Sequence, residues 1–177
     1  NNAIIVTPSA DLKIAIPGIV FGSVGTCGQR CTTTRRLIIH ESIYDQVKTQ
    51  LVRAYQQLDS RIGNPLSEGI LIGPMIDAEA VKTFQNALEQ IKKQGGTILT
   101  GGESVQNGPS GLYVRPVLAE AENHWEIVQE ETFGPLLYLI RYQYFDDALQ
   151  LQNDVPQGLS SAIFTNDLKE SERFLSH

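Results

Sequence analysis

Cysteine and histidine are scarce, because this chain of 177 residues contains only two cysteines and three histidines. Cys27 and Cys31 are not followed by a second cysteine or histidine pair at the spacing of a structural zinc site, so we expect no metal. A disulfide between them is a weaker alternative, because Gly28 favours a loop and an intracellular compartment keeps thiols reduced. We therefore expect both thiols to be free.

Positive charge is also in short supply. The net charge is -6 and the sequence pI is about 5.0, with no basic stripe of the kind that neutralises phosphates. Nucleic acids and anionic membrane surfaces are thereby excluded as expected partners. No apolar run approaches the roughly 20 residues that span a bilayer, and the first residues lack the pattern of a signal peptide. We expect a cytoplasmic protein whose ligand is a small molecule.

The hydrophobic content of 41% in 177 residues is sufficient for one sizeable core, which indicates a single domain. The chain has no initiator methionine, and a buried-strand pattern begins at residue 2. Its last residues, from Leu168 on, stop inside an amphipathic helical pattern that has no glycine to end it. We therefore expect residues 1–177 to be a segment of a longer protein, truncated at both ends.

Strand and helix patterns alternate along the chain. Runs of β-branched and aliphatic residues predict the strands, and apolar residues at helical spacing predict the helices. Asp11 is positioned to cap the first helix, which is apolar enough to be mostly buried, and Pro116 should weaken pairing within its strand. The expected strands are 2–6, 36–40, 97–100, 112–120, 136–142 and 161–164, and the helices 12–24, 42–58, 78–94, 145–153 and 168 onward. This order predicts an α/β three-layer sandwich with a mainly parallel sheet.

Cys31 is the residue around which candidate chemistry gathers. A cysteine becomes a nucleophile as its thiolate, which backbone N–H groups, a neighbouring cation or a helix end can stabilise. Gly25, Thr26 and Gly28 give the loop before Cys31 freedom to present the sulfur, and Arg30 lies directly beside it in sequence. Taken alone, a small buried hydrophobic role for this cysteine remains the stronger alternative.

Two motifs favour a catalytic role for Cys31 over a structural one. The run VGTCGQRC resembles the G-Q-x-C signature around the active-site cysteine of the aldehyde dehydrogenase superfamily, and ETFGPLLYL resembles the E-x-F-G-P motif that follows roughly one hundred residues later. Further stretches resemble the family in the same order, and together they cover essentially the whole chain. They are NNAIIV, IGNP, IGPMID, GGTILTGG, YVRPVL and GLSSAIFTND.

The resemblance implies a role for individual residues. Cys31 would be the nucleophile, and its backbone N–H would help to hold the oxyanion. Glu131 would accept hydrogen bonds from the ribose hydroxyls of NAD, with NADP as the alternative cofactor, and Phe133 would pack near the ribose and nicotinamide. The alternatives are a solvated charge for Glu131 and a core aromatic for Phe133. Cys27 is interpreted as a structural neighbour.

The resemblance is greatest to the α-aminoadipic semialdehyde dehydrogenase (antiquitin) branch, because GQRCTTTRRLIIHES has threonine two positions after the cysteine. In that branch Arg30 would meet the charged amino-acid end of a substrate from lysine degradation, through its forked donors. Arginine also occurs at this position in other branches, so a role without substrate contact stays open for Arg30.

The resemblance also implies parts that this sequence does not contain. The general-base glutamate, a side-chain oxyanion donor and the cofactor-binding domain would precede Asn1, so residues 1–177 alone are expected to be inactive. Family members assemble as dimers or tetramers, which suggests a homo-oligomeric parent. Three alternatives remain, namely a broad-range aldehyde dehydrogenase, a CoA-acylating relative and a non-catalytic module of a split protein.

Overall fold

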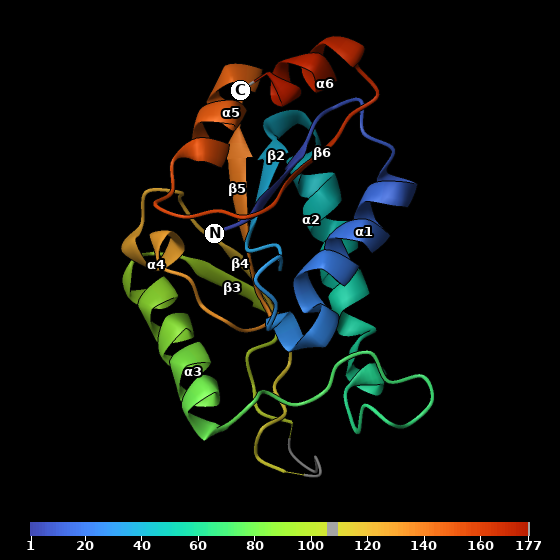
Figure 1. Cartoon of the computed structure of the whole chain (residues 1–177), viewed down its shortest axis with the longest axis vertical. Coiled ribbons are helices and arrows are strands. Elements are labelled where there is room, and N and C mark those ends of the chain that lie inside the picture. Colours follow the sequence, from blue (N-terminus) through green and yellow to red (C-terminus); the bar gives the residue numbers. More distant parts are fainter. Residues whose placement is uncertain (106–109, 177) are drawn as a thin grey trace.

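A six-stranded sheet forms the centre of the computed structural model, which describes residues 1–105 and 110–176 (Figure 1). The strands are β1 (Ala3–Val6), β2 (Arg36–His40), β3 (Thr97–Thr100), β4 (Val117–Glu120), β5 (Leu136–Tyr142) and β6 (Ser161–Phe164). Their order across the sheet is β3-β4-β5-β2-β1-β6. Only the pair of β3 and β4 is antiparallel, so the predicted mainly parallel sheet is confirmed.

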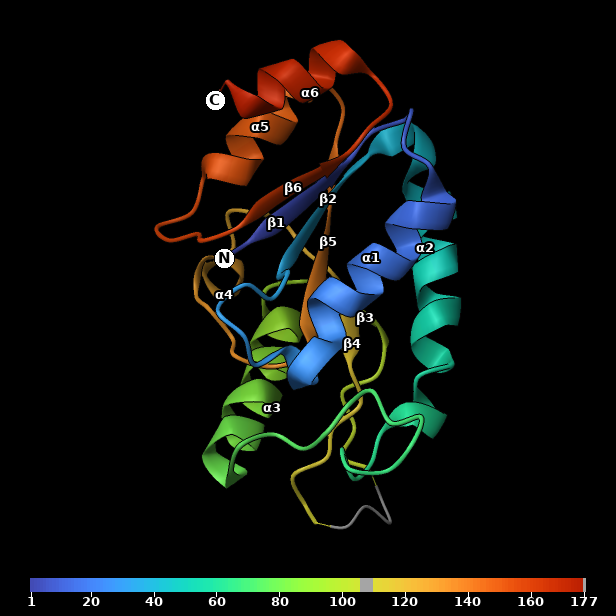
Figure 2. The same cartoon turned by 45° about the vertical axis from the view of Figure 1, so that its right-hand side comes forward.

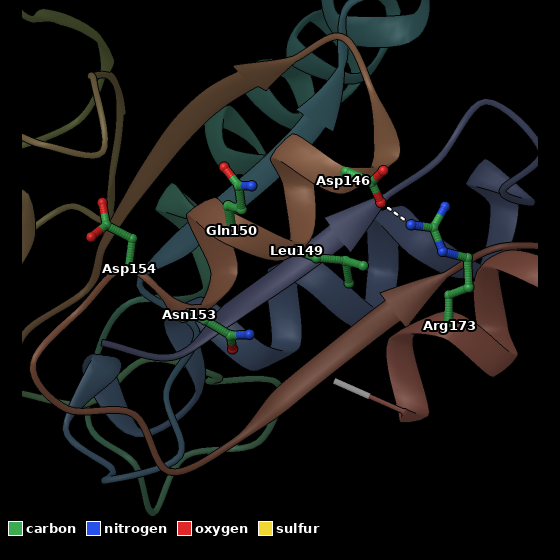
Figure 3. A pocket seen from close by; sticks show the side chains of 6 residues that line it. All are labelled: Asp146, Leu149, Gln150, Asn153, Asp154 and Arg173. Atoms are coloured by element: carbon green, nitrogen blue, oxygen red, sulfur yellow. Dashed lines mark hydrogen bonds and ion pairs between the residues drawn. The ribbon is translucent and has the colours of Figure 1, made fainter.

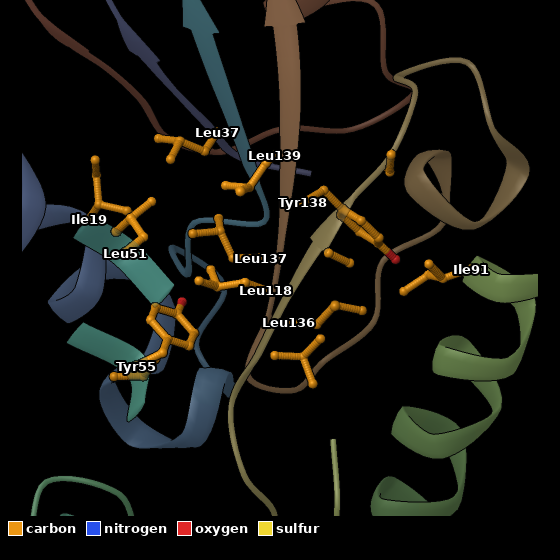
Figure 4. Close-up of a cluster of buried hydrophobic side chains, with 14 of the residues drawn as sticks. Ile19, Leu37, Leu51, Tyr55, Ile91, Leu118, Leu136, Leu137, Tyr138 and Leu139 are labelled. Carbon is orange, nitrogen blue, oxygen red and sulfur yellow. The ribbon is translucent and has the colours of Figure 1, made fainter. Parts of the chain in front are cut away.

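Helices cover both faces of this sheet, which gives the three layers that the sequence predicted (Figure 2). The helices are α1 (Leu12–Val24), α2 (Glu41–Gln56), α3 (Ala78–Lys93), α4 (Glu126–Gln129), α5 (Phe145–Asn153) and α6 (Leu168–Leu175), with 3-10 turns η1 (Gly25–Gly28) and η2 (Asp59–Arg61). Ile19 and Leu51 of α1 and α2 lie on one side of β4 and β5, and Ile91 of α3 lies on the other (Figure 4). On the described residues, no helix combines the length and hydropathy that crossing a membrane requires.

Local sequence signals account for the helix boundaries. The Asp11 carboxylate accepts from the Lys13 N–H, Asp77 caps α3 through the Ala80 N–H, and Asp167 caps α6. Each aspartate thereby satisfies a backbone N–H that the first helical turn leaves without a partner. Pro116 lies directly before β4, and the strand is confined to the residues after it because proline has no N–H to pair.

The prediction that the first helix is mostly buried is wrong. Ala15, Ile19, Ser23 and Val24 face the core, but the opposite side of α1 is open, with Ile14 and Phe21 exposed. Apolar residues occur on all sides of α1, so composition could not show which side the sheet covers. The hydrophobic core therefore draws on one side of α1 and on α2 and α3, where Val47, Leu51 and Phe84 are fully buried.

Candidate active site

Two of the predicted site residues, Cys31 and Glu131, meet at one edge of the sheet. Cys31 precedes β2, Glu131 precedes β5, and Asn2 and Leu159 come just before β1 and β6. Because these four strands are parallel, the segments that enter them lie at the same edge. A cleft of about 180 Å³ is lined there by Asn1, Asn2, Cys31, Glu131, Gln157, Gly158 and Leu159. The structure therefore brings together Cys31 and Glu131, which are one hundred positions apart in the sequence.

Cys31 is exposed, and hydrogen bonds fix the backbone on either side of it. The side-chain amide of Asn2 donates to the Cys31 carbonyl at 2.7 Å and to the Thr33 carbonyl at 2.9 Å. The Arg30 N–H also donates to the Thr33 hydroxyl at 3.1 Å, which closes a tight turn around the cysteine. Within residues 1–105 and 110–176, the N–H of Cys31 donates to no protein acceptor. That group therefore has no protein partner and belongs to a residue that lines the cleft.

Asn2 connects the cysteine loop to the segment before β6. Its Oδ1 accepts from the N–H groups of Leu159 and Ser160, both at 2.9 Å, while its amide nitrogen holds the carbonyls of Cys31 and Thr33. Asn2 is 4% exposed, so these bonds are protected from competition with water. Sequence reasoning placed Asn2 only in a strand and missed this role.

The turn before Cys31 adopts an unusual backbone. Thr26, Cys27 and Gly28 have φ values of 56°, 53° and 66°, which is the left-handed region that favours glycine. A Cβ on Gly28 would lie 2.2 Å from the Gly134 carbonyl oxygen. Only glycine therefore allows the cysteine loop to approach the loop before β5 so closely.

Cys27 lies inside the protein, in agreement with its interpretation as a structural neighbour. It is 1% exposed, and its sulfur lies 3.6 Å from the Met75 sulfur. Burial raises the pKa of the Cys27 thiol to about 12, because a thiolate would lose its hydration there. Both cysteines are free, so the disulfide alternative finds no support.

A buried arginine, Arg35, lies beneath the cleft and contacts both loops. Its Nη1 donates to the carbonyl oxygens of Gly28 at 2.8 Å and Gly134 at 2.7 Å. Its Nη2 lies 3.6 Å from the Glu131 carboxylate, and its guanidinium carbon lies 5.2 Å from the centre of the Phe133 ring. Burial lowers the pKa of Arg35, and the charge of Glu131 opposes that change. No local sequence signal distinguishes Arg35 from an ordinary polar residue.

Glu131 and Phe133 are both accessible. The Glu131 side chain is 43% exposed although its partner Arg35 is 1% exposed, and Phe133 is 44% exposed. Phe133 is therefore not a core aromatic, and Glu131 is fixed from one side by a buried cation instead of being freely solvated. Both side chains could contact a ligand that enters the cleft.

Arg30 points away from this cleft. Its guanidinium carbon lies 5.4 Å from the centre of the exposed Phe21 ring, and it packs across Gly25 at the end of α1. Its Nε is buried and has no acceptor among residues 1–105 and 110–176. The structure thus places Arg30 beside the nucleophile loop, on the side of α1, and not among the residues that line the cleft with Cys31 and Glu131.

A larger cavity, of about 620 Å³, lies between α5 and α6, where an ion pair joins Asp146 to Arg173 (Figure 3). Leu149, Gln150, Asn153 and Asp154 complete its lining, and no cysteine is among these residues. Volume alone would favour this cavity as a site. We favour the smaller cleft, because it holds an exposed thiol, a free backbone N–H and a carboxylate that is held in place.

Comparison with known proteins agrees with the motifs around that cleft. The model of the aldehyde dehydrogenase family matches residues 1–177. The chain belongs to the aldehyde dehydrogenase family. Aldehyde dehydrogenase family 7 member B4 of Arabidopsis thaliana is 46% identical over 175 residues, which cover 99% of this chain and 34% of the relative. The α-aminoadipic semialdehyde dehydrogenase of Mus musculus is 47% identical over 176 residues, covering 99% of this chain and 32% of the relative.

Two solved structures share the fold. Betaine aldehyde dehydrogenase of Staphylococcus aureus, crystallised in complex with NAD+, superimposes with a TM-score of 0.95 at 27% identity, over 99% of this chain and 35% of that one. HpcC of Thermus thermophilus gives a TM-score of 0.92 at 32% identity, over 98% of this chain and 34% of that one. The chain therefore spans about a third of the length of the proteins that it matches.

Proposed function

We propose that this chain supplies the nucleophile and part of the cofactor site of an NAD(P)-dependent aldehyde dehydrogenase. The observation that supports this most strongly is the cleft in which the exposed Cys31 thiol and the Glu131 carboxylate lie together. Membership of the aldehyde dehydrogenase family over residues 1–177 agrees with it. Neither residue type alone would indicate a reaction, but a nucleophile beside a ribose-binding carboxylate suits oxidation of a carbonyl.

The proposed chemistry begins with the thiolate of Cys31. Its sulfur adds to the aldehyde carbon, forming a C–S bond, and the carbonyl π electrons move to oxygen, where the Cys31 N–H can donate to the oxyanion. When the carbonyl re-forms, hydride leaves the carbon and a thioester on Cys31 remains. Water gives a proton to the general base as its oxygen adds to the thioester carbon, the C–S bond breaks, and the carboxylic acid and the thiolate are released. Two moderate barriers thereby replace one high barrier.

The nicotinamide cofactor would accept the hydride, and the residues present fit it. The Glu131 carboxylate is exposed at the cleft and can accept hydrogen bonds from two ribose hydroxyl groups. The Phe133 ring offers an accessible apolar surface beside it. NAD+ is bound in the structure of the Staphylococcus aureus relative, which supports NAD over NADP as the first cofactor to test. These two residues would bind and orient the cofactor.

The substrate that we propose is α-aminoadipic semialdehyde, an intermediate of lysine degradation. Support comes from the relatives of that name, which are 46–47% identical over nearly the whole chain. Arg30 would bind the charged end of such a substrate, because guanidinium pairs with a carboxylate through two donors. Arg30 lies over Phe21 and does not line the cleft with Cys31, so this role is supported by the relatives and requires the charged end of the substrate to extend from the cleft toward α1.

We further propose that residues 1–177 form the catalytic domain and that the general base and the cofactor-binding domain lie outside them. The share of about a third in each relative supports this division. The chain by itself would then be inactive, because no base activates the water for thioester hydrolysis. A homo-oligomeric parent protein also remains part of this proposal.

NADH formation by the full-length protein tests the proposed function. We expect kcat/KM for α-aminoadipic semialdehyde to exceed that for a simple aliphatic aldehyde, and Arg30→Ala to remove most of the difference. Similar kcat/KM values for the two aldehydes would indicate a broad-range aldehyde dehydrogenase. Product formation that required coenzyme A would indicate the acylating reaction, and no NADH with any aldehyde would overturn the proposal.

A further inference from the structure

We propose that Arg35 is a positioning residue that holds the Glu131 carboxylate in place for the cofactor and joins it to the nucleophile loop. This inference rests on the proposed function, because it assigns Arg35 a part in that site. Arg35 touches neither Cys31 nor the open space of the cleft in the contacts described above. It acts through Glu131, Phe133 and the backbone of the two loops.

The contacts of Arg35 require a cation with two separate donor nitrogens. A single nitrogen of Arg35, Nη1, donates to Gly28 and Gly134, whose carbonyls belong to segments 106 residues apart. The other terminal nitrogen, Nη2, reaches the Arg30 carbonyl at 3.5 Å and Glu131 at 3.6 Å. A lysine ammonium is a compact point charge, and it cannot span these four oxygens from one position.

Burial of the cation determines how Glu131 is presented. The guanidinium of Arg35 is 1% exposed and approaches the carboxylate from inside the protein, while Glu131 remains 43% exposed on the solvent side. An ion pair at a surface would be weakened by water and salt, but this cation is screened much less. Glu131 is thereby held toward the cleft and stays accessible to ribose hydroxyl groups.

The adjacent residue, Arg36, provides a matched control. It is also fully buried, and its donors go to the carbonyls of Asn1, Leu151 and Gln152 and to the Asn123 side chain, not to Glu131. Burial lowers the pKa of Arg36 to about 10. Replacing Arg36, the first residue of β2, thus removes a buried arginine next to Arg35 without removing a contact to Glu131.

The test is a double-mutant cycle on the full-length protein, with the dissociation constant for NAD+ measured by calorimetry. The variants are Arg35→Lys, Glu131→Gln, the two combined, and Arg36→Lys as the control. We expect Arg35→Lys to raise Kd about tenfold in the wild-type background but about twofold or less when Glu131 is already glutamine, because residues that act through one contact are not additive. Arg36→Lys should lower Tm and leave Kd within about twofold, since additive sites do not couple.

A steady-state measurement separates positioning from general damage. We expect Arg35→Lys to raise KM for NAD+ and to change KM for the aldehyde less than about twofold, because only cofactor binding is uniformly weakened. An equal increase of Kd in both backgrounds would overturn the inference. If Arg35→Lys does not fold, Arg35→Gln replaces it, and failure of both to fold while Arg36→Lys folds would show a structural role only.

The outcome also distinguishes this inference from the proposed function. A wild-type protein that binds no NAD+ and forms no NADH with any aldehyde would overturn both. A wild-type protein that binds NAD+ and oxidises aldehydes, but whose Arg35 and Glu131 variants combine additively, would overturn only the role of Arg35.

Discussion

Cys27 and Cys31 lie four positions apart in one loop, yet their surroundings differ completely. Cys27 is 1% exposed, lies against Met75, and has a pKa raised by burial to about 12. Cys31 is exposed in the cleft that it shares with Glu131. The backbone, and not the residue type, determines which thiol can react: a left-handed turn over Thr26, Cys27 and Gly28 directs one sulfur inward and leaves the other at the surface.

The largest expected difference between the two cysteines is in catalysis. In the full-length protein, Cys31→Ser should lower kcat/KM for aldehyde oxidation by about 1,000-fold or more, because a serine hydroxyl is a far weaker nucleophile than a thiolate. Cys27→Ala should retain activity within about threefold, since it removes only one buried sulfur. The activity of both variants is measured as NADH formation. An equal loss of activity in both would show that Cys31 has no catalytic role that Cys27 lacks.

The next largest effect concerns the turn that separates the two environments. Gly28→Ala should lower the free energy of unfolding by about 2 kcal/mol or more, because the residue has a positive φ and its new Cβ would meet the Gly134 carbonyl at 2.2 Å. Gly69→Ala is the matched control, because the φ of Gly69 is also positive, at 79°, but nothing lies within 4 Å of its Cβ position. Urea titration compares the two, and similar losses would argue against a close contact between the loops.

The smallest expected effect is a pH dependence that belongs to Cys27. Its pKa is higher in the folded protein, about 12, than the ordinary value of 9.0, so above pH 9 the unfolded chain ionises first. The contribution of Cys27 is therefore fully present below pH 9 and is lost as pH rises toward 12. Between pH 8 and pH 10 the wild type should lose about 1 kcal/mol more stability than Cys27→Ala. Parallel losses in urea titrations at the two pH values would show that Cys27 is not buried.

Local signals were sufficient to predict most of the fold from the sequence. Asp11 at the start of α1, the glycines after α3 and the aliphatic run of β5 each specify structure through neighbouring residues, and the predicted order of strands and helices was confirmed. The exposure of Ile14 and Phe21 was not predicted, because an apolar helix does not indicate which of its sides finds a partner.

The site was predicted only in part, for a related reason. Motifs identified Cys31, Glu131 and Phe133 as candidates, and the parallel sheet explains why the segments before β2 and β5 meet. The roles of Asn2 and Arg35 depend on contacts with residues 157 and 99 positions away, at Leu159 and Gly134. No local pattern marks such contacts, because an asparagine in a strand or an arginine after a cysteine looks like an ordinary polar residue.

Alkylation of the full-length protein at pH 7 to 8 shows whether Cys31, and not Cys27, is the nucleophile. Iodoacetamide modification of each cysteine is followed by peptide mass mapping, and residual NADH formation is measured in the same samples. We predict that Cys31 reacts about 100-fold faster than Cys27, since reaction needs an accessible thiolate, and that activity is lost in step with its modification. Equal rates for the two thiols, or activity that persists after Cys31 is fully modified, would contradict this account.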